Sequence, residues 1–228
     1  MRRQERRLGY IAFIIVASAF GLAISASLLG NPAPFHLEFA RRKTLVSVVF
    51  GSVCVAGILA ALFPLPCEGV LGIRSRPGED AASLGMRATR LAGVLVLHGH
   101  HPPGPGEKRH ELRFGRKSFC ASCYGLLTGA VVSLAMVAVF ALTSWRDIHL
   151  AYVLYGLGVL AAILALVQAL VFSPGARTRF VLAAGFVVGA SLMLIATDMV
   201  TTSLAADLFI VLLAVFWLLS RISLSHRD

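Results

Sequence analysis

The chain has 228 residues, of which 57% are hydrophobic and only 14% are charged. Ordinary soluble domains carry about 25% charged residues, so the composition excludes a soluble domain and indicates a membrane protein that lies in the lipid bilayer. The formal net charge of +10 is a feature of nucleic-acid-binding proteins. Basic residues also gather in the cytoplasmic loops of membrane proteins, and we therefore expect no nucleic-acid partner.

The apolar residues form six runs of roughly 20, the length that spans ~30 Å of hydrocarbon at 1.5 Å per residue. The first run follows a basic start and exceeds the ~7–15 residues of a signal-peptide core, so we expect it to remain as the first transmembrane helix. Short links join the last four runs and require antiparallel neighbouring helices. The six expected spans are residues 8–29, 44–63, 124–143, 148–172, 180–197 and 203–220.

These runs predict an all-α integral membrane protein with about six transmembrane helices and one long polar loop between helices 2 and 3. We expect residues 1–66 to form an N-terminal transmembrane pair, residues 67–123 a cytoplasmic His/Cys loop, and residues 124–228 a C-terminal four-helix bundle. The apolar stretch 91–97 is too short to span and is either a strand or an interfacial segment. Small residues at four-residue spacing predict close helix contacts at Gly125, Gly129, Gly185 and Gly189.

The distribution of Lys and Arg predicts the orientation. With the N-terminus inside, 17 of the 21 Lys and Arg residues lie on the inner side, in agreement with the positive-inside tendency. We therefore expect a cell-membrane protein with both termini and the long loop in the cytoplasm. The basic run 41–43 is discordant, because this orientation puts it outside.

The expected spans contain no ionisable side chain in mid-membrane, where burial of a charge is costly. Asp198 and Asp207 flank the last outer turn, and we expect two solvated carboxylates there rather than a cation site. Proton- and ion-coupled transporters normally use buried carboxylates, so this pattern disfavours that class. A passive pore or a lipid-handling protein stays open.

The long polar loop holds a cluster of histidines and cysteines. A Cys-x-x-Cys pair in a tight turn can present two thiolates to one zinc ion at ~2.3 Å, with two further ligands from elsewhere. The basic neighbours Arg113, Arg116 and Lys117 favour deprotonated thiols. Cys54 lies in an apolar run and is expected to be a small buried hydrophobe. We predict a structural zinc site with the candidate ligands His100, His101, His110, Cys120 and Cys123.

Three other interpretations of this loop stay open. Cys120 and Cys123 at a helix start can form a redox dithiol, with Cys67 as a resolving partner. The histidines can be ordinary polar loop residues. A haem or iron–sulfur centre is disfavoured, since the loop has no Cys-x-x-Cys-His and only two suitable thiolates. No residue is assigned a catalytic role.

The same residues resemble the shared stretch of an uncharacterised family of small prokaryotic, mainly archaeal, membrane proteins. That stretch has His-His-Pro, then His, then a basic or Gly-containing turn, then Cys-x-x-Cys-x-Gly opening a transmembrane helix. A further cysteine often follows His-His-Pro in the family, where this chain has Pro103 and Gly104. If that cysteine is a ligand in the family, its role passes to a histidine here or the site is degenerate. The matching positions are His100, His101, Pro102, His110, Gly115, Cys120, Cys123 and Gly125.

The resemblance implies a membrane protein with a His/Cys loop and implies no substrate. Taken together, these observations lead us to expect a transport, assembly or accessory component whose loop is held by zinc, rather than an enzyme. The alternatives are a membrane-bound thiol oxidoreductase that uses the Cys-x-x-Cys pair, and a channel or carrier for an unidentified solute. A homo-oligomer or a partner in a membrane complex is compatible with the sequence.

Overall fold

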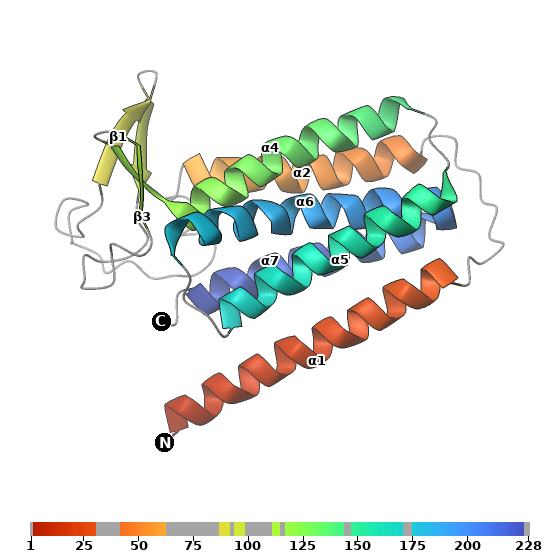
Figure 1. Ribbon diagram of the computed structural model, residues 1–228, viewed down its shortest axis with the longest axis horizontal. Coiled ribbons are helices and arrows are strands. Elements are labelled where there is room, and N and C mark those ends of the chain that lie inside the picture. Colours follow the sequence, from red (N-terminus) through yellow and green to blue (C-terminus); the bar gives the residue numbers. More distant parts are fainter. Residues whose placement is uncertain are drawn as a thin grey trace.

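Six long helices dominate the structure (Figure 1). The computed structural model describes residues 2–30, 42–62, 87–91, 94–98, 111–114, 117–143, 147–170 and 175–225. Each predicted span corresponds to one helix, with ends that differ by a few residues. The helices are α1 (Arg2–Gly30), α2 (Arg42–Leu62), α4 (Ala121–Leu142), α5 (Ile148–Leu170), α6 (Ala176–Thr201) and α7 (Leu204–Ser225).

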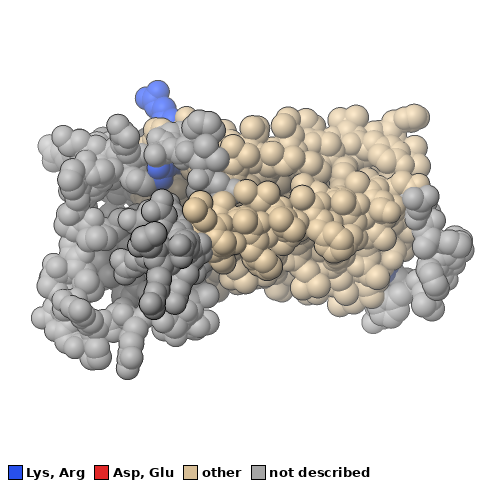
Figure 2. All heavy atoms as spheres, turned by 90° about the horizontal axis from the view of Figure 1, so that it is seen from below, with Lys and Arg blue, Asp and Glu red and all other residues tan. Residues whose placement is uncertain are grey.

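All six helices are long and apolar enough to cross a bilayer, with candidate spans of 18 to 26 residues. Large apolar side chains point outward along them, as at Val16, which is 68% exposed, and Leu212, which is 67% exposed. The face in Figure 2 carries no charged side chain along the helices between the two ends of the bundle. An apolar exterior of this extent needs a lipid environment. The protein is therefore a multi-pass membrane protein whose membrane-spanning part is all-α, as predicted.

Helix α6 lies at the centre of the bundle. It packs against α4, α5 and α7, while α2 packs against α4 and α7. The aromatic rings of Phe186 on α6 and Trp217 on α7 meet in the core with centroids 6.5 Å apart. Helix α1 lies at the periphery in Figure 1 and is held by polar contacts inside the apolar layer. Trp217 Nε1 donates to Ser18 Oγ at 3.0 Å, and the hydroxyls of Ser25 and Tyr155 are 2.5 Å apart.

Glycines allow α6 to approach two of its neighbours closely. A Cβ added at Gly129 of α4 would lie 2.6 Å from a backbone oxygen of α6. A Cβ added at Gly189 of α6 would lie 2.8 Å from the backbone oxygen of Gly158 on α5, and Gly125 likewise abuts α6. Close contact is thus confirmed at three of the four predicted glycines. The prediction was wrong for Gly185, whose Cβ position has no atom within 4 Å, because the α5–α6 contact forms one turn further along.

The polar segment between α2 and α4 contains two antiparallel hairpins. Strand β1 (Arg87–Leu91) pairs with β2 (Val94–His98), and β3 (Glu111–Phe114) pairs with β4 (Lys117–Cys120). The described residues of the stretch 91–97 are in strands, as one interpretation predicted, but they belong to two strands that pair through Leu91 and Val94 rather than to one. Strand β4 runs directly into α4. In Figure 1 the hairpins lie at the end of the bundle where the N and C ends of the chain are marked.

Candidate functional site

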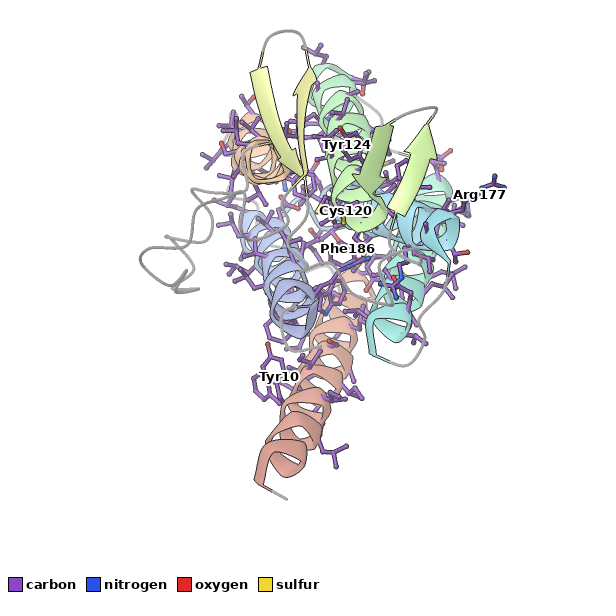
Figure 3. The ribbon with its side chains drawn as sticks, turned by 90° about the vertical axis from the view of Figure 1, so that its left-hand side faces the viewer. Tyr10, Cys120, Tyr124, Arg177 and Phe186 are labelled. Carbon is purple, nitrogen blue, oxygen red and sulfur yellow. The ribbon has the colours of Figure 1, made fainter. Side chains whose placement is uncertain are left out.

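The two cysteines of the Cys-x-x-Cys pair meet where β4 becomes α4. Cys120 is the last residue of β4 and the N-cap of α4, with an extended backbone (φ −67°, ψ 118°), and Cys123 lies in the first helical turn. Both are free, half-buried thiols. Figure 3, seen from the hairpin end, shows Cys120 among the helix ends, whereas Arg177 points away from the bundle. The structure therefore brings together the two predicted thiol ligands.

The first turn of α4 stabilises a thiolate at Cys120. The neighbouring Cys123 thiol is the main reason why the pKa of Cys120 is lowered from 9.0 to about 6, because a thiol beside it favours the thiolate through hydrogen bonding. Burial opposes the shift, while backbone N–H groups of Ser122 and Cys123 and the charge of Arg179 add to it. The N–H groups of the first turn of a helix have no intrahelical acceptors and favour negative charge near the helix start.

A buried arginine lies close to the thiol pair. Arg221, near the end of α7, donates from Nη2 to Gln168 Oε1 at 3.3 Å, and its guanidinium carbon is 5.8 Å from the ring centroid of Phe186. Its charge acts on Cys123, and its Nη1 atom is buried without a hydrogen-bond partner. A guanidinium in this position favours negative charge on the thiols. The thiol end of the bundle is thus electropositive.

The predicted histidine ligands His100, His101 and His110 lie outside the described residues. Within the described part of the chain, no group of three or more His, Cys, Asp or Glu side chains could hold a metal ion. The register of the β3–β4 hairpin shows which residue lies opposite Cys120. Glu111, which follows His110 in the sequence, is the direct partner of Cys120 across the β3–β4 pair, and such partners have Cα atoms about 4.5–5.5 Å apart.

The two remaining cysteines have different positions. Cys54 is 3% exposed in the core formed with α4, α6 and α7, which confirms the prediction of a small buried hydrophobe. Cys67, the suggested resolving partner, lies outside the described residues. The described thiols other than Cys54 are therefore the Cys120–Cys123 pair alone.

The opposite end of the bundle contains a buried ionic cluster. Arg42, the first residue of α2, lies with Nη2 2.8 Å from Asp198 Oδ1 on α6 and with Nη1 2.6 Å from Asp207 Oδ2 on α7. The side chains are 12%, 7% and 0% exposed in that order. The prediction of two solvated carboxylates was wrong. Helix α6 continues to Thr201 and α7 starts at Leu204, so both carboxylates are enclosed by helices.

Lys43 also has partners inside this end of the bundle. Its Nζ atom lies 3.7 Å from the ring centroid of Phe140 and donates to the backbone oxygen of Thr143 at 2.5 Å. Two charges of the discordant basic run 41–43 are therefore bound by protein groups rather than exposed. The sequence did contain a signal for this cluster, because it put a basic run and two aspartates at the same end of the predicted bundle.

Comparison of the chain with protein-family models, with curated proteins and with solved structures finds no match. The function is therefore argued from the residues themselves.

Proposed function

We propose that this is a cell-membrane protein whose cytoplasmic polar segment is anchored to the bundle by a structural zinc ion, in a transport, assembly or accessory role. The observation that carries the proposal is the pair of free thiols, Cys120 and Cys123, at the junction of β4 and α4. The remaining ligands would come from His100, His101 and His110. Membership of the prokaryotic family that shares this stretch is part of the same proposal.

The donors at this junction suit zinc. Zinc takes thiolates at about 2.3 Å and imidazoles in a tetrahedral site, and a pKa of about 6 at Cys120 makes one thiolate available at neutral pH before any metal binds. Glu111, which pairs with Cys120, directly follows His110 in the sequence, and this supports His110 as a ligand. A bound zinc ion would supply a closed, four-coordinate cross-link between hairpin and helix.

Such a cross-link would stabilise the polar segment. Its described part consists of two separate two-stranded sheets, and an isolated two-stranded hairpin is marginally stable in water. A domain of about 60 residues buries only about 60% of the surface that its unfolded chain exposes and is marginally stable. Metal binding contributes directly to the folding free energy of such segments. Zinc would thus order the polar segment rather than catalyse a reaction.

The contacts of Arg42 and Lys43, two residues of the discordant basic run, support the proposed orientation. The positive-inside tendency concerns basic residues that stay near the membrane as free charges. Arg42 is bound by two carboxylates, and Lys43 is bound by Phe140 and Thr143. With those two charges compensated, the excess of Lys and Arg on the side of the termini is larger than a simple count suggests.

Elemental analysis of the purified full-length protein tests the zinc site. We expect one zinc ion per chain in the parent protein and none in the Cys120→Ser/Cys123→Ser variant, whose polar segment should also become sensitive to protease. Cys54→Ala is the matched control, because it removes a thiol from the core and should retain the metal. A parent protein without zinc, or zinc retained by the double variant, contradicts the proposal.

The orientation is tested separately with two exposed residues, one at each end of the bundle. Thr202 lies in the α6–α7 turn, and Arg177 lies at the start of α6 at the other end of the bundle. A membrane-impermeant maleimide should label Thr202→Cys in intact cells, and Arg177→Cys only after permeabilisation, with the parent chain as background. The reverse labelling pattern contradicts a cytoplasmic polar segment.

A thiol–disulfide oxidoreductase is the second candidate, favoured by the lowered pKa of Cys120 at the N-terminus of α4. In that reaction the Cys120 thiolate attacks one sulfur of a substrate disulfide and releases the other as a thiolate, which takes up a proton. Cys123 then loses its proton and attacks Cys120 Sγ, which releases the second substrate thiolate. The substrate gains two electrons and the pair becomes a disulfide. Thiol titration discriminates the candidates, because zinc-bound thiolates react only after chelation, whereas a free dithiol reacts without it.

A further inference from the structure

The ionic cluster at the end of the bundle opposite the thiols joins three helices that are distant in the sequence. Arg42 comes from the start of α2, Asp198 from the last turns of α6, and Asp207 from the first turn of α7. Arg42 Nη1 donates to Asp207 Oδ2 at 2.6 Å. Its contact with Asp198 Oδ1 is close, at 2.8 Å, but lacks hydrogen-bond geometry. One guanidinium thus serves two carboxylates.

The charges in this cluster do not balance when both carboxylates are ionised. Among the described residues, the groups that act electrostatically on Asp207 are Asp198 and Arg42, which leaves an excess of one negative charge in this part of the structure. Lys43, on the same helix as Arg42, is directed to the Phe140 ring and to a backbone oxygen. Asp147, at the start of α5, is exposed. The described parts of α1 and α4 bring no charged side chain to this end.

Buried side-chain oxygens in this cluster lack a hydrogen-bond partner in the described structure. Asp207 is 0% exposed, and its Oδ1 atom has no hydrogen-bond donor in the described structure. The carboxyl groups of Asp207 and Asp198 lie close together, because both contact the one guanidinium of Arg42, at 2.6 and 2.8 Å. Two carboxylates that close, in a site of low dielectric, cannot both be ionised without a large cost, and sharing one proton removes it. The side-chain oxygen of Thr197, next to Asp198, is also buried without a hydrogen-bond partner.

We propose that Asp198 and Asp207 bind one proton between them and form a proton-binding site, with Arg42 as the counter-ion of the remaining charge. The proton gives Asp207 Oδ1 a hydrogen-bond partner and makes the cluster electrically neutral within the bundle. Because the three groups belong to α2, α6 and α7, loss of the proton places repulsion at the point where these helices meet. The site therefore links proton binding to the packing of the bundle, independently of the thiol end.

Infrared spectroscopy of the purified full-length protein tests this site through the carbonyl stretch of a protonated carboxylic acid. A solvated aspartic acid has a pKa of about 3.9, so roughly one molecule in a thousand is protonated at pH 7. We expect instead one protonated carboxyl group per chain at pH 7. Labelling the parent protein with ¹³C-aspartate should shift the band, which assigns it without any substitution.

Substitutions then locate the proton. Asp207→Asn should remove the band, and Asp147→Asn should retain it, because Asp147 is exposed and binds backbone N–H groups of α5. A parent protein with no such band at pH 7 overturns the proposal, as does a band that Asp207→Asn and Asp198→Asn both leave intact. Loss of the band when sodium is added at constant pH would identify a metal cation as the occupant and would also overturn it. None of these results depends on zinc.

Discussion

The close approach of α4 and α6 at Gly129 can be tested with one added methyl group. In Gly129→Ala the new Cβ would lie 2.6 Å from the backbone oxygen of Ala184 and 2.9 Å from its Cα. Non-bonded carbon atoms prefer about 3.5–4.0 Å, so the two helices must separate by roughly 1 Å. Overpacking of this kind costs about 1–3 kcal/mol. We expect Gly129→Ala to lower the free energy of unfolding.

Gly185→Ala is the matched control, because its Cβ would meet no atom within 4 Å. Both substitutions gain the same intrinsic helix propensity, about 1 kcal/mol, so the difference between the variants isolates the packing cost. We expect Gly129→Ala to be less stable than Gly185→Ala by about 1–3 kcal/mol, measured by reversible unfolding in mixed micelles with increasing denaturing detergent. Equal unfolding midpoints would refute the close contact between α4 and α6.

Three further predictions concern single contacts. Arg42→Gln leaves two buried carboxylates without their counter-ion and should cost about 3–5 kcal/mol of stability in the same unfolding assay; an unchanged midpoint would contradict the buried cluster. After zinc removal by a chelator, the alkylation rate of Cys120 should rise with pH through about 6, because the thiolate forms above its pKa, and then level off. Cys123→Ala removes the thiol that is the largest cause of the lowered pKa and should move that midpoint toward 9.0; no movement refutes this role of Cys123. Ser18→Ala removes the acceptor of the Trp217 Nε1 hydrogen bond and should cost about 1–3 kcal/mol, because it leaves a buried donor unsatisfied; an unchanged unfolding midpoint would contradict this contact.

The spans were predictable because they depend on a local property. A run of about 20 apolar residues has to be helical in lipid, where every backbone polar group needs an internal partner. Neighbouring polar and Pro residues mark the ends, and the predicted and observed ends therefore differ by only a few residues. The small-residue spacing predicted Gly125 and Gly129 for the same reason, since one helix face follows from the sequence of one helix.

The interhelical partners were not predictable in this way. Arg42 and Asp207 are 165 positions apart, and neither sequence neighbourhood says that the other lies opposite. The sequence therefore suggested solvated carboxylates, whereas packing of α2 against α7 buries them. The Cys120–Cys123 pair was found because its spacing is local. The lowered pKa of Cys120 could not be predicted from the sequence, because it depends on the thiol of Cys123 and on the position of Arg179 on another helix.

The two proposed sites lie about one membrane thickness apart, and this separation predicts that they act independently. Arg179, near the thiols, and Asp198, in the ionic cluster, both belong to α6, and at 1.5 Å per residue they are about 28 Å apart. Substitutions so far apart, with no shared partner, usually have additive effects within about 0.5 kcal/mol. We therefore expect the stability loss of Cys120→Ser/Cys123→Ser combined with Asp207→Asn to equal the sum of the two separate losses. A coupling clearly larger than that would mean that α6 has two arrangements and that both sites bias the same equilibrium, because no direct contact spans the distance.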